Sequence, residues 1–248
     1  MRNPLPPNRL PRRLTQLLAG LVLYGGSMAM LIRSGLGLDP WDIFHDGLTR
    51  HLPLSFGTVV IVVGALVLLL WIPLRQKPGI GTVLNVIVIG LAVDAGLALL
   101  PDAEGWVERV ALMVVAVVLN GLAGALYVGA QLGTGPRDGL WVALSRRTGK
   151  STRLIRTLLE LTVLGIGWLL GGAVGIGTVV YALAIGPLVQ WFMPWVASGL
   201  RPRRPSRSRG TTSSASPPAD SLGPAADPLG VTSTHCGNLR AFVTSMPT

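Results

Sequence analysis

The sequence GLGLDPWD, residues 35–42, lies between two long apolar runs and predicts the start of a short helix. Asp39 is a good N-cap because its carboxylate accepts hydrogen bonds from the free N–H groups of a first helical turn. Pro40 then falls at the first helical position, where its missing N–H costs nothing. Asp42 falls at the third position, where a carboxylate is favoured by the positive end of the helix dipole. We therefore expect a helix to begin at Pro40.

The same pattern returns in the sequence LGTGPRD at residues 132–138, where Pro136 lies 96 positions after Pro40 (136 − 40 = 96). The same shift of 96 places GIGTV at residues 79–83 on an identical GIGTV at residues 175–179. Five consecutive identities in an ungapped register predict two copies of one unit. Glycine and proline dominate the shared positions, so the copies share above all the path of the backbone.

The two copies are expected to span residues 14–101 and 110–197. A basic segment, residues 1–13, precedes them, and an acidic connector, residues 102–109, joins them. Residues 198–248 are rich in Arg, Pro and Ser with few large apolar groups, so they predict a disordered tail. The backbone-shaping positions of both copies are Gly35, Gly37, Pro40, Gly79, Gly81, Gly133, Gly135, Pro136, Gly175 and Gly177.

Composition indicates a membrane protein. Only 13% of the residues are charged and the mean hydropathy is +0.56, whereas a soluble domain carries about a quarter charged residues. The net charge is +10, but the basic residues flank apolar runs rather than covering one face, so no nucleic-acid partner is expected. The single cysteine, Cys236, excludes an intramolecular disulfide.

Six apolar runs are long enough, at about 20 residues, to predict membrane spans. The uncharged stretch from 161 to 200 is too long for one span and is divided at a glycine-rich turn, residues 171–175. The expected spans are residues 14–32, 54–72, 80–100, 110–131, 154–170 and 176–196.

The basic segments place the chain in the membrane. The positive-inside rule puts residues 1–13, the basic loop 132–153 and the tail 198–248 in the cytoplasm, and the connector 102–109 outside. Because three spans per copy is an odd number, the second copy enters from the opposite side. The predicted fold is all-α, with six transmembrane helices as two inverted-topology three-helix repeats, each carrying a short Pro-initiated helix between its first two spans. Such repeats are frequent in secondary transporters.

The two Pro-initiated helices are either re-entrant or interfacial, and the sequence leaves both open. Trp41 suits a cavity wall or the aromatic belt. A helix start that faces a cavity favours an anionic or carboxylate-bearing ligand. If the space is filled instead, Asp42 and Asp138 are expected to fold back and cap their own helices.

Polar residues inside the spans complete the candidates. Asp94 is an acid in an apolar span, a functional hypothesis by default, although it also lies close enough to the outer end to reach the interface. Asn85 more often joins helices than binds ligands. Glu160 is expected to pair with Arg156, and a coupling-ion role is the alternative. The candidate ligand or ion site comprises Asp39, Trp41, Asp42, Asn85, Asp94, Arg137, Asp138 and Glu160.

Small residues at Gly121, Ala125 and Gly129 predict close helix packing, within the fold or with a second copy of the chain. Asp42 and His45 share a helix face, but the second copy does not repeat the pair, and no metal is expected. No nucleophile–base pair, phosphate loop or dinucleotide fingerprint is present, so neither an enzyme nor a cofactor is expected.

Four segments together resemble the YczE/YitT-type family of bacterial multi-pass membrane proteins. They are GLGLDPWD at 35–42, GIGTV at 79–83, GPRDGL at 135–140 and RRTG at 146–149. The resemblance covers about residues 14–197. It implies a location in the bacterial cytoplasmic membrane, but it implies no catalytic or ligand residues.

Two functions remain after these arguments. The first is a transporter of a small molecule or an ion, with the lipid bilayer and that ligand as partners. The second is a membrane scaffold or regulator that acts through partner proteins. A polar cavity that both motifs line favours transport, whereas tight packing throughout favours the scaffold.

Overall fold

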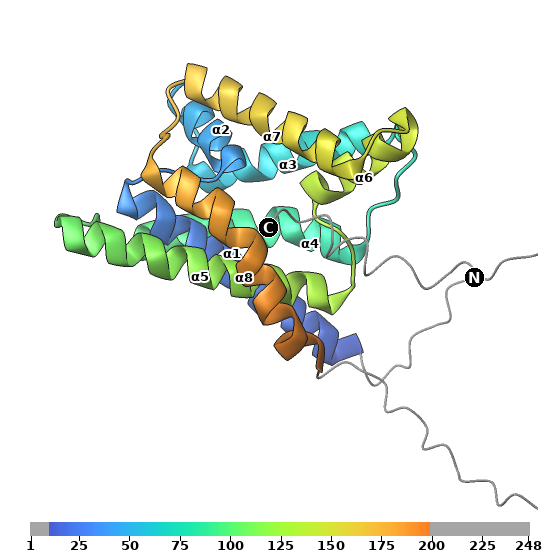
Figure 1. The fold of residues 1–248 in the computed structure, drawn as a ribbon, viewed down its shortest axis with the longest axis horizontal. Coiled ribbons are helices and arrows are strands. Elements are labelled where there is room, and N and C mark those ends of the chain that lie inside the picture. The colour runs from blue at the N-terminus through green and yellow to red at the C-terminus, as the bar shows by residue number, and fades with distance from the viewer. Residues whose placement is uncertain (1–9, 199–248) are drawn as a thin grey trace, which may run out of the picture.

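The computed structural model describes residues 10–198, and this part of the chain forms eight α-helices and no strand (Figure 1). The helices are α1 (Leu10–Ser34), α2 (Pro40–Thr49), α3 (Phe56–Trp71), α4 (Ile80–Leu99), α5 (Trp106–Ala130), α6 (Pro136–Thr148), α7 (Thr152–Leu169) and α8 (Ile176–Ser198). The predicted all-α class is confirmed for the described residues. The N-terminal residues 1–9 and the tail from 199 on, with Cys236, lie outside them.

Each of the six predicted spans coincides with a helix. Four of these, α1, α4, α5 and α8, are long and apolar enough to cross a membrane. The helix α3 is apolar but has only 16 residues, fewer than the roughly 20 that a straight span needs. The helix α7 carries Arg153, Arg156 and Glu160 among its 18 residues. Length and composition therefore support four spans directly.

The helices lie in two layers. In Figure 1 the four long apolar helices α1, α4, α5 and α8 form the lower layer, and α2, α3, α6 and α7 lie above them. Glycines bring the lower helices close: a Cβ added at Gly20 in α1 would lie 2.9 Å from the Cβ of Leu126 in α5. The predicted small-residue stripe packs within the fold, because a Cβ at Gly121 would lie 2.7 Å from the Cβ of Leu188 in α8.

Both Pro-initiated helices are present at the predicted positions. The helix α2 begins at Pro40 and α6 begins at Pro136. Asp39 caps α2 as predicted, since its Oδ1 accepts a hydrogen bond of 2.7 Å from the backbone N–H of Asp42. The residue before α6 is Gly135, which provides no side-chain cap.

Each motif loop contacts the GIGTV segment of the other copy through the backbone. The N–H of Gly177 donates to the carbonyl of Leu36 at 2.8 Å, and the N–H of Gly81 donates to the carbonyl of Leu132 at 3.2 Å. The two bonds join equivalent positions, because 36 + 96 = 132 and 81 + 96 = 177. The two predicted copies are therefore joined by two equivalent backbone hydrogen bonds.

Two glycines in these loops are required by the backbone. Gly37 has φ +122° and Gly133 has φ +150°, conformations that L side chains rarely adopt. A side chain is also excluded by space, since a Cβ at Gly37 would lie 2.7 Å from the backbone nitrogen of Gly175. A Cβ at Gly133 would lie 2.8 Å from the Oγ1 of Thr82. These glycines let the two loops approach their partner turns.

Candidate functional site

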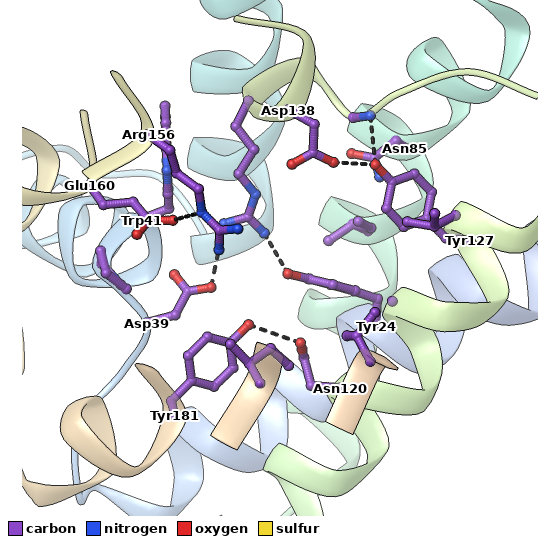
Figure 2. A pocket seen from close by; sticks show the side chains of 18 of the residues that line it. Tyr24, Asp39, Trp41, Asn85, Asn120, Tyr127, Asp138, Arg156, Glu160 and Tyr181 are labelled. Carbon is purple, nitrogen blue, oxygen red and sulfur yellow. Dashed lines mark hydrogen bonds and ion pairs between the residues drawn. The ribbon is translucent and has the colours of Figure 1, made fainter. Parts of the chain in front are cut away.

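A cavity of about 130 Å³ lies between the two layers and receives residues from every helix except α3. Both Pro-initiated helices line it at their first turns, through Pro40 on α2 and Arg137 on α6. Six of the eight predicted candidates line this cavity: Asp39, Trp41, Asn85, Arg137, Asp138 and Glu160 (Figure 2). The first turns of the two Pro-initiated helices thus meet at one cavity.

Arg137 connects three helices at the centre of the cavity. Its Nη1 lies 3.4 Å from Oδ2 of Asp39, and its Nη2 donates to the hydroxyl of Tyr24 at 2.6 Å. The guanidinium also lies 5.7 Å from the centre of the Tyr24 ring. An arginine has five N–H donors, so Arg137 retains donors that no described residue accepts. Its side chain is 26% exposed, whereas that of Asp39 is 4% exposed.

Asp138 has a hydroxyl partner and no basic partner in the part of the chain that the structure describes. Its Oδ2 accepts from the hydroxyl of Tyr127, and this hydroxyl accepts from the backbone N–H of Gly135 at 2.8 Å. Tyr127 therefore links Asp138 to the residue before α6. Figure 2 shows both side chains beside the cavity.

A second ion pair lies on the wall that α7 provides. Nε of Arg156 donates to Oε1 of Glu160 at 2.9 Å, as predicted from their spacing. The guanidinium of Arg156 also lies over Trp141, 4.9 Å from the ring centre. The ion pair therefore forms within α7, and Arg156 also stacks on Trp141 of α6.

Two asparagines in the cavity have different partners. The amide of Asn120 donates to Oγ of Ser27 at 2.8 Å and accepts from the hydroxyl of Tyr181 at 2.9 Å. The amide of Asn85 forms no hydrogen bond with any described residue. Asn120 thus joins α5 to α1 and α8, whereas Asn85, for which the sequence favours such a role, has its amide beside the cavity without a hydrogen bond to a described residue.

The residues that sequence reasoning missed are the tyrosines. The chain has three, Tyr24, Tyr127 and Tyr181, and all three line the cavity. A signal was available, because the shift of 96 places Tyr24 on Asn120 (24 + 96 = 120) and Asn85 on Tyr181 (85 + 96 = 181). Polar residues exchanged between equivalent positions of apolar helices indicate a shared polar centre.

Two predicted candidates lie outside this cavity. Asp94 faces the start of α3, where its Oδ1 accepts from the N–H of Gly57 at 2.7 Å and its Oδ2 accepts from the hydroxyl of Ser55 at 2.6 Å. Asp42 lines a smaller cavity of about 50 Å³, with its Oδ1 3.3 Å from Nδ1 of His45.

The sequence leaves two alternatives for the helix starts, and a cavity lies there rather than a filled space in which Asp42 and Asp138 cap their own helices. Asp42 faces His45, because Asp39 already accepts from the N–H at this position. Asp138 accepts from the hydroxyl of Tyr127, and this hydroxyl, rather than Asp138, accepts from the N–H of Gly135. Neighbouring side chains supplied better-placed partners in both cases.

The apolar helices of spanning length, packed around a buried polar centre, define a multi-pass α-helical membrane protein. Residues 11–194 match the model of a family described as "Family of unknown function (DUF6198)", and the chain belongs to this family.

Three curated relatives agree with this assignment. An uncharacterised protein of Haemophilus influenzae is 36% identical over 181 residues, which are 73% of this chain and 83% of the relative. The uncharacterised membrane protein YczE of Bacillus subtilis is 34% identical over 184 residues, 73% of this chain and 86% of YczE. YyaS of the same organism is 24% identical over 71% of this chain and 90% of YyaS. The resemblance to the YczE-type family is thus confirmed. No solved structure matches the chain.

Proposed function

We propose that this protein transports a small polar solute across the bacterial cytoplasmic membrane. The observation that carries the proposal is the cavity that the starts of α2 and α6 both line. Interrupted helices at equivalent positions of two repeats mark the substrate site in many secondary transporters. Charged groups away from water are costly in a membrane protein, so a cluster of five around one cavity favours a function over a purely structural role.

The transport proposal includes six spans in two inverted repeats, with both termini in the cytoplasm. Support comes from the paired backbone contacts between Leu36 and Gly177 and between Leu132 and Gly81. In this arrangement α3 and α7 are the second span of each repeat.

Cysteine labelling tests the topology. In a Cys236→Ala background, Glu104→Cys is expected to react with an impermeant thiol reagent in intact cells, because the connector lies outside. Lys150→Cys is expected to react only after permeabilisation. Labelling of both positions from the same side would contradict the inverted repeat.

Ligand stabilisation and uptake test the function. The purified full-length chain is heated in detergent with a panel of metabolites and ions, because a ligand that binds the native state raises the apparent stability. Any ligand found is then offered to liposomes that contain the protein. We expect uptake with the native chain and with Arg146→Gln, an exposed substitution on α6, and no uptake with Arg137→Gln. Stabilisation without uptake would favour the scaffold or regulator.

A further inference from the structure

We propose that the solute is a small zwitterion, an amino-acid-like molecule whose carboxylate binds Arg137 and whose ammonium group binds Asp138. This inference rests on the proposed transport function and names its substrate class. It is carried by the size of the cavity, the free donors of Arg137, the position of Asp138 and the balance of charge around them.

The volume limits the solute. The cavity measures about 130 Å³, and an apolar cavity of about 150 Å³ holds benzene, a molecule of about six non-hydrogen atoms. Alanine has the same number of non-hydrogen atoms as benzene. Nucleotides, disaccharides and lipids are therefore too large for this conformation.

The carboxylate of the solute has a donor group in Arg137. The contact between Arg137 and Asp39 is long, at 3.4 Å, and Arg137 retains N–H groups without a described partner. A guanidinium matches a carboxylate with two parallel hydrogen bonds. The start of α6 lies beside it without a side-chain cap, and its dipole favours negative charge there. The start of α2 offers no such place, because Asp39 already occupies it.

The ammonium group of the solute has an acceptor in Asp138. This carboxylate lines the cavity and has no basic partner among the described residues, while one of its oxygens accepts from Tyr127. Asp138 follows Arg137 directly in α6, so the two charges lie at the same helix start. Both side chains line the same cavity, so a solute with both charges can contact both.

The charge balance around the cavity disfavours a solute that is only an anion. Arg137 faces Asp39 and Arg156 pairs with Glu160, which leaves Asp138 as the remaining charge. The dipole of α6 partly offsets this charge, since Asp138 lies in its first turn. A solute anion would add a second negative charge to a site away from water, which is unfavourable, whereas the ammonium group of a zwitterion offsets the charge of Asp138 and its carboxylate faces Arg137.

L-alanine and two smaller molecules, each with only one of its charged groups, separate the two halves of the proposal. Calorimetry on the purified full-length chain compares L-alanine with propionate, which lacks the ammonium group, and with ethylamine, which lacks the carboxylate. We expect L-alanine to bind at least about tenfold more tightly than either, equivalent to about 1.4 kcal/mol. Propionate binding as tightly as L-alanine would overturn the ammonium site, and ethylamine binding as tightly would overturn the carboxylate site.

Variants assign each charge to its residue. Asp138→Asn is expected to abolish the preference for L-alanine over propionate and to keep propionate binding. Arg137→Lys keeps the charge beside Asp39 and is expected to weaken L-alanine at least tenfold through loss of the paired hydrogen bonds. Arg146→Gln is the matched control and should bind like the native chain. Unchanged L-alanine affinity in both cavity variants would overturn the assignment.

The outcomes also separate this inference from the transport function. Binding of L-alanine without uptake into liposomes would uphold the zwitterion site and refute transport. Uptake of another class of solute, with no heat from L-alanine, would refute the zwitterion and uphold transport.

Discussion

The helices α2 and α6 both begin with proline beside the cavity, but the groups around their starts have different partners. The start of α2 is satisfied within its own chain segment, because Asp39 accepts from the N–H of Asp42. The start of α6 has Gly135 in place of an acid and depends on Tyr127 from α5. Both helices begin with proline at equivalent positions, but the start of α2 is capped by its own Asp39 and the start of α6 is contacted by Tyr127 of α5.

The same contrast holds for the asparagine–tyrosine pairs. Asn120 and Tyr181 are joined by a hydrogen bond of 2.9 Å. The equivalent Asn85 and Tyr24 are not joined, and the hydroxyl of Tyr24 accepts from Arg137. Arg137 has Trp41 as its equivalent in the other predicted copy (41 + 96 = 137), so Arg137 has no counterpart that could donate to Asn120 in the same way.

The largest expected effect compares Gly175→Ala with Gly79→Ala, two equivalent glycines. A Cβ at Gly175 would lie 2.2 Å from the carbonyl oxygen of Leu36, and one at Gly79 would lie 2.7 Å from that of Leu132. The backbone must move in both cases. We expect Gly175→Ala to lower the free energy of unfolding by about 3 kcal/mol and Gly79→Ala to lower it by about 1 kcal/mol. Chemical denaturation in detergent measures both, and equal losses would show that the two loop contacts are equally tight.

The asparagines provide an intermediate effect. Asn120→Leu leaves the hydroxyl of Tyr181 without its acceptor and should reduce the free energy of unfolding by about 2 kcal/mol. Asn85→Leu breaks no hydrogen bond and should change it by less than about 0.5 kcal/mol. The same denaturation measurement applies. A loss at Asn85 as large as that at Asn120 would mean that Asn85 also forms a hydrogen bond in solution.

The smallest expected effect compares two equivalent helix caps. Oγ of Ser55 accepts from the N–H of Thr58 at 3.2 Å and donates to Asp94, whereas Oγ of Ser151 accepts from the N–H of Leu154 at 3.3 Å. Ser55→Ala should therefore cost about 1.5 kcal/mol and Ser151→Ala about 0.7 kcal/mol. Thermal melting of the two variants in the same detergent resolves the difference, and the reverse order would remove Asp94 from the cap of α3.

The sequence predicts the helices well because their causes are local. Long apolar runs and the Asp-Pro and Gly-Pro starts locate α2, α6 and the six longer helices, although α1 and α5 begin four residues earlier than expected, at Leu10 and Trp106. The family resemblance depends on the same local motifs. These signals require no knowledge of how the helices pack.

The site is only partly predictable, because its contacts join distant segments. The role of Asp94 depends on where the start of α3 lies relative to α4, which no spacing in the sequence expresses. The bond from Gly177 to Leu36 uses backbone atoms alone, so no side-chain pattern reveals it. The tyrosines were detectable only by comparing the two copies position by position.

The exchange of loop contacts between the copies imposes an order on biosynthesis. Gly81 leaves the ribosome 51 residues before its acceptor Leu132 (132 − 81 = 51), and Leu36 waits 141 residues for Gly177 (177 − 36 = 141). The contact of Gly81 can form once the second motif loop has been synthesised, whereas the contact of Leu36 must wait for the start of α8. A nascent chain arrested at the connector therefore carries two backbone groups, the N–H of Gly81 and the carbonyl of Leu36, whose partners lie in the part of the chain not yet made.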